Sequence, residues 1–287
     1  MSAARAVTVW THGRPQQVAG TLAALIEAAR ASGVTLRLDA AEAGKHDLEA
    51  AAGDGVVIAG AEAIDDVELC VVLGGDGTIL KGLRRYAGTG VPVFAVNFGE
   101  IGFLATLEPD ELDEFGFERA FAGEFEVLGL PAIAFDARSG THTAINDFSV
   151  HRQVGGRVAQ LSYGVEGHEV GSVRCDGLVV CTPAGSTGYN LANGGPVLAW
   201  GVEGFGVSFI APHSLTARAL VVAPGDTLTV SNRGREPVDV SVDGRPTCDL
   251  VPGEEVHVRF QPRATSLAQL PESTFYRRLR EKFGRLA

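Results

Sequence analysis

Hydrophobic positions along the first hundred residues follow two alternating spacings. Short apolar runs typical of buried strands recur, and between them apolar residues follow the three-to-four spacing of an amphipathic helix. Strands that alternate with helices indicate a parallel sheet with helices on its faces. The predicted strands are residues 6–10, 34–38, 56–59, 68–73 and 92–96, and the predicted helices are residues 17–31 and 79–86.

The pattern changes near residue 105. One helix with an acidic first turn is predicted at residues 109–122, and a final helix at residues 271–286 is expected to return to the first domain. Between them, short alternating runs are separated by turns rich in Gly, Pro and Asn, which is typical of an all-β domain. These predicted strands are residues 126–130, 132–136, 161–165, 178–181, 227–231, 238–242 and 255–260.

Composition narrows the class of protein. The chain has 287 residues, of which 45% are hydrophobic, so it can bury a full core. Its formal net charge of −11 argues against a nucleic-acid or membrane-surface binder, because either would need a basic face. No apolar run reaches the roughly 18 residues of a membrane span, and no Cys-x-x-Cys pair occurs. We therefore expect a cytoplasmic protein with reduced thiols.

A glycine-rich turn after the strand predicted at residues 68–73 carries the first candidate chemistry. It reads Gly74-Gly75-Asp76-Gly77-Thr78 and leads into a predicted helix. Glycines let the backbone approach a phosphate without a Cβ in the way, and free N–H groups at a helix start favour an anion. A carboxylate in such a turn either binds Mg²⁺ or accepts the proton of an attacking hydroxyl. The turn thus indicates phosphoryl transfer at the carboxyl end of a parallel strand.

A second polar turn follows the strand predicted at residues 178–181. Several side chains in it can hydrogen-bond, and the ring of Tyr189 could stack on a base. A tight strand–helix junction with a packed tyrosine explains the same residues equally well, because polar glycine-rich turns are common.

Taken together, the motifs resemble those of NAD kinases, which use ATP to phosphorylate NAD to NADP. The resemblance covers most of the chain in the family's order, and the Thr-Pro-x-Gly-Ser-Thr-x-Tyr segment is its most specific part. The matching segments are GGDGT at 74–78, GEIGFL at 99–104, INDF at 145–148, CDGLVVCTPAGSTGYNLANGGP at 175–196, PHSLTARALVV at 212–222, VDG at 242–244 and FYRRLREKFG at 275–284.

The resemblance implies an architecture and a set of ligands. We expect a Rossmann-like α/β domain at residues 1–105, to which residues 265–287 return, and a β-sandwich-like NAD-binding domain at residues 106–264. It further implies NAD as acceptor, ATP or polyphosphate as donor, Mg²⁺ or another divalent metal, and a homodimer or homotetramer. The sequence does not indicate the metal ligands.

The resemblance also assigns roles to single residues. Asp76 would be the catalytic base that accepts the proton of the adenosine-ribose 2′-hydroxyl, with Mg²⁺ binding as the alternative. The phosphate-binding residues would be Gly74, Gly75, Gly77, Thr78 and Lys81. The NAD-binding residues would be Phe103, Asn146, Asp147, Arg157, Arg174, Asp176, Ala184, Thr187, Gly188, Tyr189, Asn190, Leu191, Ala192 and Arg245.

Three positions depart from the family pattern. Asp147 stands where the family has Glu, Cys175 where it usually has Gly, and Gly188 where it usually has Ala. A Cys would be strained at position 175 if the backbone there needs a positive φ. Two alternatives stay open at this point. One is a non-catalytic relative that senses NAD(P), and the other is a lipid or diacylglycerol kinase that shares the GGDGT turn.

Overall fold

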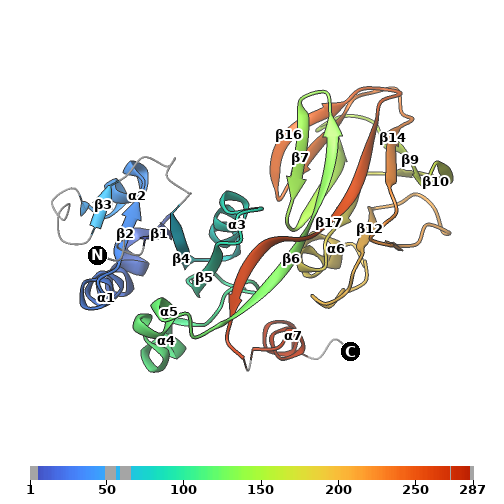
Figure 1. Cartoon of the computed structure of the whole chain (residues 1–287). Helices are drawn as coiled ribbons and strands as arrows, with labels where there is room; N and C mark the ends of the chain where they lie inside the picture. The colour runs from blue at the N-terminus through green and yellow to red at the C-terminus, as the bar shows by residue number, and fades with distance from the viewer. Residues whose placement is uncertain (1–5, 49–55, 59–65, 272, 285–287) are drawn as a thin grey trace. The chain divides into compact units, whose positions relative to one another are not determined.

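The computed structural model describes residues 6–48, 56–58, 66–271 and 273–284. The chain divides into two compact units: unit 1 comprises residues 1–129 and 265–287, and unit 2 comprises residues 130–264 (Figure 1). Unit 2 is thus inserted within the sequence of unit 1. The sequence-based boundary after residue 105 lies before the division at 129/130, whereas the return to the first unit begins at residue 265 in both descriptions.

Unit 1 is built on a parallel sheet. The end of β17 (Glu255–Gln269) adds a further parallel strand next to β5, through Ser266 and Leu267. The other strands, in spatial order, are β3 (Val56–Ile58), β2 (Thr35–Leu38), β1 (Ala6–Thr11), β4 (Val67–Gly74) and β5 (Pro92–Asn97).

Helices cover both faces of this sheet, because β4 is apolar on both sides. Leu69, Val71 and Leu73 face the apolar cluster that includes α1, α4 and α5, whereas Cys70 and Val72 lie against Gly82 of α3. Figure 1 shows α3 on the opposite face of the sheet from α4 and α5. The helices of unit 1 are α1 (Pro15–Ser32), α2 (Ala40–Lys45), α3 (Asp76–Arg85), α4 (Pro109–Phe115), α5 (Phe117–Phe121) and α7 (Phe275–Phe283).

Unit 2 is a sandwich of two antiparallel layers. One layer has the order β13-β12-β11-β8-β15-β16, and the other contains β10-β9-β14-β17 together with β6 and β7. An apolar cluster that includes Phe148 and Val150 of β8 fills the interior. The strands are β6 (Glu126–Ala137), β7 (Gly140–Ala144), β8 (Asp147–Arg152), β9 (Ala159–Val165), β10 (His168–Cys175), β11 (Gly177–Cys181), β12 (Phe205–Ile210), β13 (Leu220–Val222), β14 (Leu228–Asn232), β15 (Val238–Val242) and β16 (Arg245–Leu250), with the short helices η2 (Ala184–Thr187) and α6 (Tyr189–Ala192).

This architecture confirms the predicted α/β domain, β-rich domain and returning terminal helix. Several predicted elements nevertheless differ from the structure. The single helix predicted at residues 109–122 is two helices, because Gly116 takes a φ of 77° between them. Helix α3 begins at Asp76 rather than at residue 79, and β6 continues through Pro131, where two strands were predicted. Within the described residues, no helix is long and apolar enough to cross a membrane.

Candidate active site

The GGDGT turn joins β4 to α3 by a close backbone approach. A Cβ on Gly74 would lie 2.8 Å from Cβ and Oγ1 of Thr78, and a Cβ on Gly75 would lie 2.9 Å from Cα of Gly99. Both positions therefore need glycine. Gly75 caps α3, so Asp76 is the first residue of the helix, where free N–H groups and the helix dipole favour an anionic ligand.

The Asp76 carboxylate is held on both of its oxygens. Oδ2 accepts the backbone N–H of Phe103 at 3.1 Å, and Oδ1 accepts that of Leu104 at 2.9 Å. The side chain is half-buried. Each carboxylate oxygen can accept more than one bond, so Asp76 can still take a proton or a cation while the two N–H groups fix its direction.

The loop that holds Asp76 is itself anchored by two buried side chains. Oδ1 of Asn97 accepts the N–H of Gly99 at 2.9 Å. The guanidinium of Arg278 in α7 donates to the carbonyls of Phe103 at 3.3 Å and Thr106 at 3.0 Å. Burial lowers the pKa of Arg278 from its ordinary value. Sequence reasoning missed both anchors: Asn97 could have been noticed as the polar end of a strand, but nothing near Arg278 signals its partners.

The remaining candidates of unit 1 take different positions. Gly77 is exposed, Thr78 is half-buried, and the ammonium of Lys81 lies 3.8 Å from the centre of the Trp10 ring. Lys81 also lies 3.6 Å from the buried carboxylate of Glu42. The ring of Phe103 is only 3% exposed and packs against α7, so its side chain belongs to the core and only its backbone faces Asp76.

In unit 2, Asp243 organises the Asn146–Asp147 turn. One of its oxygens accepts the backbone N–H groups of Ile145, Asn146 and Asp147 at 3.1, 2.8 and 3.3 Å. Asp243 has a φ of 45°, and its own N–H donates to the carbonyl of Asp147 at 2.8 Å. The sequence motif Val-Asp-Gly marked this turn, but its function of holding the other turn is visible only in the structure.

The two polar side chains of this turn have unusual surroundings. Asp147 is 8% exposed, and burial together with the nearby Asp243 carboxylate raises its pKa to about 7. Oδ1 of Asn146 is buried and accepts no hydrogen bond from the described residues. An orphaned acceptor beside a carboxyl that is easily protonated can bind neighbouring hydroxyl groups.

The Gly-Ser-Thr-Gly-Tyr segment packs directly on the Asn146–Asp147 turn. A Cβ on Gly185 would lie 2.0 Å from the carbonyl oxygen of Asn146. Tyr189 follows this contact, is 38% exposed, and stacks on the ring of His151 at a centroid distance of 5.7 Å. The structure thus brings three predicted NAD-binding residues together, namely Asn146, Asp147 and Tyr189, and adds His151, for which the sequence had given no role.

Other residues of the segment mainly support its shape. The Asn190 side chain is fully buried and donates to the carbonyls of Ser186 at 3.0 Å and Pro196 at 2.9 Å. Ala184 is buried, and its carbonyl accepts the Thr187 hydroxyl at 3.3 Å. The two remaining predicted residues are Leu191, which is half-buried, and Ala192, which is exposed.

The predicted charged residues form a separate group. Arg157, Arg174 and Asp176 line one cavity of unit 2, in which Arg152 donates to Asp176 at 2.6 Å. Tyr189 does not line this cavity. Arg245 is exposed at the start of β16 and is absent from that lining too.

The departures at positions 175 and 188 are accommodated. Cys175 is the last residue of β10 and does not have a positive φ, so its backbone is not strained. Burial raises the pKa of its thiol to about 11. At Gly188, a Cβ would meet its nearest neighbour, the carbonyl oxygen of Gly185, at 3.4 Å. The space would therefore admit the alanine that the family usually has there.

Comparison with known proteins decides the family. A family model of the ATP-NAD kinase N-terminal domain matches residues 14–125, and one of the C-terminal domain matches residues 145–270. The chain belongs to the ATP-NAD kinase family. Its curated relatives include the NAD kinase of Symbiobacterium thermophilum, which is 34% identical over 91% of this chain and 92% of the relative. Another is the NAD kinase of Gemmatimonas aurantiaca, 36% identical over 76% of this chain and 78% of the relative.

Solved structures of NAD kinases share the fold. Yeast NADH kinase complexed with NADH superposes with a TM-score of 0.87 at 22% identity, over 100% of this chain and 91% of that chain. An NAD kinase from Archaeoglobus fulgidus in complex with ATP gives a TM-score of 0.72 at 23% identity, over 98% of both chains. The family match over both domains decides against a lipid kinase, which shares only the GGDGT turn.

Proposed function

We propose that this chain transfers the terminal phosphoryl group of ATP or polyphosphate to the adenosine-ribose 2′-hydroxyl of NAD, which yields NADP. The observation that carries this proposal is the Asp76 carboxylate, held on both oxygens at the N-terminus of α3. The names of the relatives support it, because they are curated as NAD kinases. The solved relatives are described with NADH and with ATP, which supports the classes of acceptor and donor.

Asp76 acts as the general base in this proposal. Its carboxylate accepts the proton of the 2′-hydroxyl while the ribose oxygen forms a bond to the terminal phosphorus. The bond between that phosphorus and the oxygen of the leaving phosphate breaks, and ADP or a shortened polyphosphate departs. The hydrogen bonds from the N–H groups of Phe103 and Leu104 keep the orientation of the carboxylate fixed during this transfer.

The GGDGT turn binds the donor phosphates. The glycines at 74, 75 and 77, with Thr78, form the turn from β4 into the start of α3, and Lys81 adds a positive charge. Mg²⁺ would be held mainly by the phosphate oxygens of the donor, and Asp76 would be its protein ligand only in the alternative in which this carboxylate does not act as the base. This fits the donor set, because Mg²⁺ favours one or two carboxylates plus substrate phosphates, and it would neutralise charge on the donor.

The Asn146–Asp147 turn binds the ribose hydroxyls of NAD. The buried, unpartnered Oδ1 of Asn146 accepts one hydroxyl, and the Asp147 carboxyl pairs with a second. The exposed part of Tyr189 offers its ring to the adenine. Arg157, Arg174 and Asp176 contact the pyrophosphate and nicotinamide end, and Arg245 is a further cation of this unit.

We also propose a cytoplasmic homodimer or homotetramer. Cys70, Cys175, Cys181 and Cys248 are free thiols, which suits a reducing compartment. Light scattering coupled to size-exclusion chromatography measures the oligomeric state, and a monomer at micromolar concentration contradicts this part of the proposal.

NADP formation by the purified chain tests the proposed function. The assay contains NAD and Mg²⁺ with either ATP or polyphosphate, and an NADP-specific dehydrogenase reports the product. Turnover with either donor is the expected result and identifies the donor. Saturable NAD binding without turnover under any of these conditions would instead identify a non-catalytic NAD sensor.

A further inference from the structure

The carboxylate of Glu42 in α2 is buried and joins three elements of unit 1. Its side chain is 2% exposed, and carboxylates are rarely buried to this extent unless they are paired. Oε2 accepts the backbone N–H of Thr11 at 3.0 Å and the Thr11 hydroxyl at 2.7 Å. The ammonium groups of Lys45 and Lys81 lie 2.6 Å and 3.6 Å from Oε1. One buried group therefore connects the end of β1, α2 and α3.

These contacts lie at the carboxyl ends of two neighbouring strands. Thr11 is the last residue of β1 and is paired with Leu73 of β4, directly before the GGDGT turn. Helix α1, which follows β1, packs on one face of the sheet, whereas α3, which follows β4, packs on the other. Ligands of parallel sheets bind at the carboxyl ends of neighbouring strands whose connections leave on opposite faces. Glu42 is therefore placed at the ligand-binding edge of the sheet.

Glu42 and the ring of Trp10 together restrict the Lys81 side chain. The Lys81 ammonium lies 3.8 Å from the centre of that ring and 3.6 Å from the carboxylate. The second distance is that of an ion pair and is too long for a hydrogen bond, so the N–H groups stay available to a ligand. A lysine has a flexible stem, and a ligand that must fix it loses affinity through lost rotamer entropy. Holding the ammonium in advance removes part of that loss.

The Glu42 side chain is itself fixed by a chain of hydrogen bonds. The Thr11 hydroxyl has a single hydrogen, which it donates to Glu42. In the contact of 2.8 Å between that hydroxyl and Nε2 of His46, the imidazole must therefore be the donor. The backbone N–H of Glu42 donates to the N-cap Asp39 at 2.8 Å, which fixes the start of α2. Both the carboxylate and the backbone of Glu42 are thus held before any ligand binds.

We propose that Glu42 is a positioning residue for the phosphate donor, because it holds the Lys81 ammonium beside the GGDGT turn. Glu42 does not touch the donor and acts through Lys81. This inference rests on the proposed binding of the donor by that turn. The charge of Glu42 alone predicts the opposite effect, since a carboxylate near a polyanion weakens binding and its removal would strengthen it. The sign of the change therefore separates positioning from simple repulsion.

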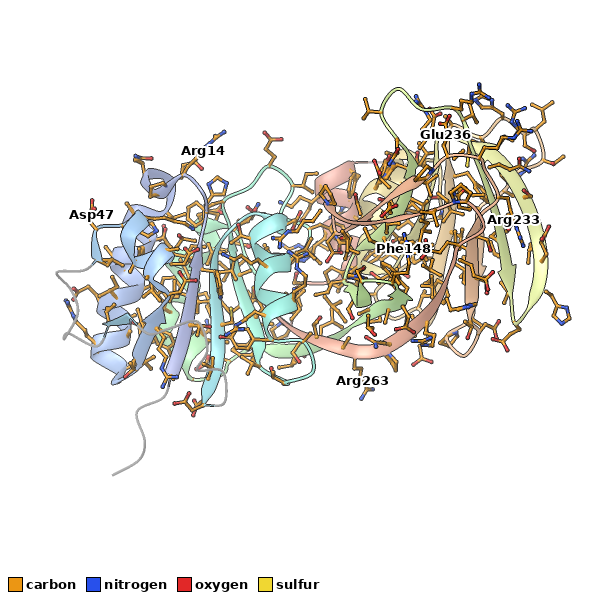
Figure 2. The ribbon with its side chains drawn as sticks, turned by 90° about the horizontal axis from the view of Figure 1, so that it is seen from above. Arg14, Asp47, Phe148, Arg233, Glu236 and Arg263 are labelled. Carbon is orange, nitrogen blue, oxygen red and sulfur yellow. The ribbon has the colours of Figure 1, made fainter. Side chains whose placement is uncertain are left out.

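Calorimetric titration of the full chain with ATP and Mg²⁺, in the absence of NAD, tests this inference. Glu42→Gln keeps an acceptor oxygen for Thr11 but removes the charge that faces the lysines. We expect its dissociation constant for ATP to rise about three- to tenfold. The matched control Asp47→Asn removes the same charge from an exposed carboxylate, which lies at the outer edge of unit 1 (Figure 2). Asn tolerates the φ of 52° at this position, so the constant should change less than about twofold.

A double-mutant cycle with Lys81→Gln tests whether Glu42 acts through that lysine. The variant Glu42→Gln/Lys81→Gln should bind ATP as Lys81→Gln does, within about a factor of two. Trp10→Leu removes the other support of Lys81 and leaves Glu42 in place, so it should also weaken ATP binding. This variant supplies a second test of the positioning of Lys81 if Glu42→Gln does not fold.

Three results would overturn the inference: unchanged or tighter ATP binding by Glu42→Gln, multiplicative losses in the double variant, or no saturable ATP binding by the wild type. Steady-state kinetics of NADP formation supply a readout that general damage to the fold would not produce. In Glu42→Gln, KM for ATP should rise with the dissociation constant, whereas KM for NAD should stay within about twofold. A wild type that binds ATP without forming NADP refutes the kinase proposal alone, so the two failures remain distinguishable.

Discussion

Two features of the structure define the surroundings of the Asp76 carboxylate, namely the hydrogen bonds that it accepts and its position at the start of a helix. Its oxygens accept the N–H groups of Phe103 and Leu104, and its place at the start of α3 puts it among the donors that favour phosphate. If the side chain at position 76 only had to accept hydrogen bonds from the loop, another hydrogen-bond acceptor of similar shape, such as Asn, could replace Asp. A general base must be able to take a proton, and that requirement separates Asp from Asn.

Asp76→Asn is expected to lower kcat for NADP formation by about two to four orders of magnitude. The carboxamide has nearly the same shape but cannot act as a base. Asp113→Asn, which changes an exposed carboxylate of α4, serves as the control and should keep its kcat. A kcat for Asp76→Asn within a factor of a few of the wild type would contradict the assignment of the base.

Asp147 should make stability depend on pH. Its pKa of about 7 in the folded chain lies above the ordinary 3.8, so the folded state holds a proton that the unfolded state releases. Stability is therefore lost as the pH rises from roughly 4 to 7, where the buried carboxyl ionises next to Asp243. The side chain of the Asp147→Asn variant stays neutral at every pH, so this variant does not lose stability over that range.

The measurement is Tm against pH for the wild type and Asp147→Asn. The Tm advantage of the variant should grow by a few degrees from pH 5 to pH 8, whereas the exposed control Asp249→Asn should show no such growth. A constant difference across this range would refute the coupling.

At the scale of elements, the contact between η2 and the Asn146–Asp147 turn depends on one missing side chain. Gly185→Ala would place a Cβ 2.0 Å from the Asn146 carbonyl, whereas Gly188→Ala would meet its nearest atom at 3.4 Å. We expect Gly185→Ala to cost about 1–3 kcal/mol of stability or more and to raise KM for NAD, because it displaces the turn. Gly188→Ala should fold normally, and equal effects of the two variants on Tm would disprove this reading.

Helix α7 contacts the loop that holds Asp76 through the guanidinium of Arg278 and through the rings of Phe275 and Phe283, which pack on Phe103. Arg278→Gln would leave the carbonyls of Phe103 and Thr106 without their buried donor, at a cost of about 1–3 kcal/mol. Because the same loop directs Asp76, kcat should fall while KM for NAD changes little. Arg280→Gln changes an exposed arginine of the same helix and is the control. A purely structural Arg278 would lower Tm and leave kcat per folded molecule unchanged.

The sequence predicts much of the local structure, misses two local details, and gives no signal for the contacts between residues far apart in the chain. The strand–turn–helix around GGDGT was predicted because glycine and apolar spacing are local signals. The break at Gly116 was missed because one glycine interrupts an otherwise helical spacing. The continuous strand through Pro131 was missed because proline is compatible with a strand wherever its N–H is not needed. The contacts of Arg278 and Asp243 were not predictable, since their partners lie up to 175 residues away.

On the scale of the whole molecule, the two substrates are assigned to different units. The residues proposed to bind the donor belong to unit 1, and those proposed to bind the ribose and adenine belong to unit 2. Each ligand should therefore protect its own set of amides from hydrogen exchange.

Hydrogen exchange measured by mass spectrometry checks this division. NAD should slow exchange in residues 145–152 and 184–192, whereas ATP with Mg²⁺ should slow exchange in residues 74–81 and 99–104. Peptides of α1, far from both motifs in sequence, provide the internal control. Protection by NAD confined to unit 1 would contradict the assignment of its binding residues.

The insertion of unit 2 into unit 1 has a consequence for biosynthesis. The ribosome releases β1 to α5 first, then all of unit 2, and only afterwards the end of β17 and α7. Until α7 has emerged, the loop that directs Asp76 lacks the donor that fixes its carbonyls. A nascent chain can thus complete the Asn146–Asp147 turn before Arg278 is available to anchor the loop that holds Asp76.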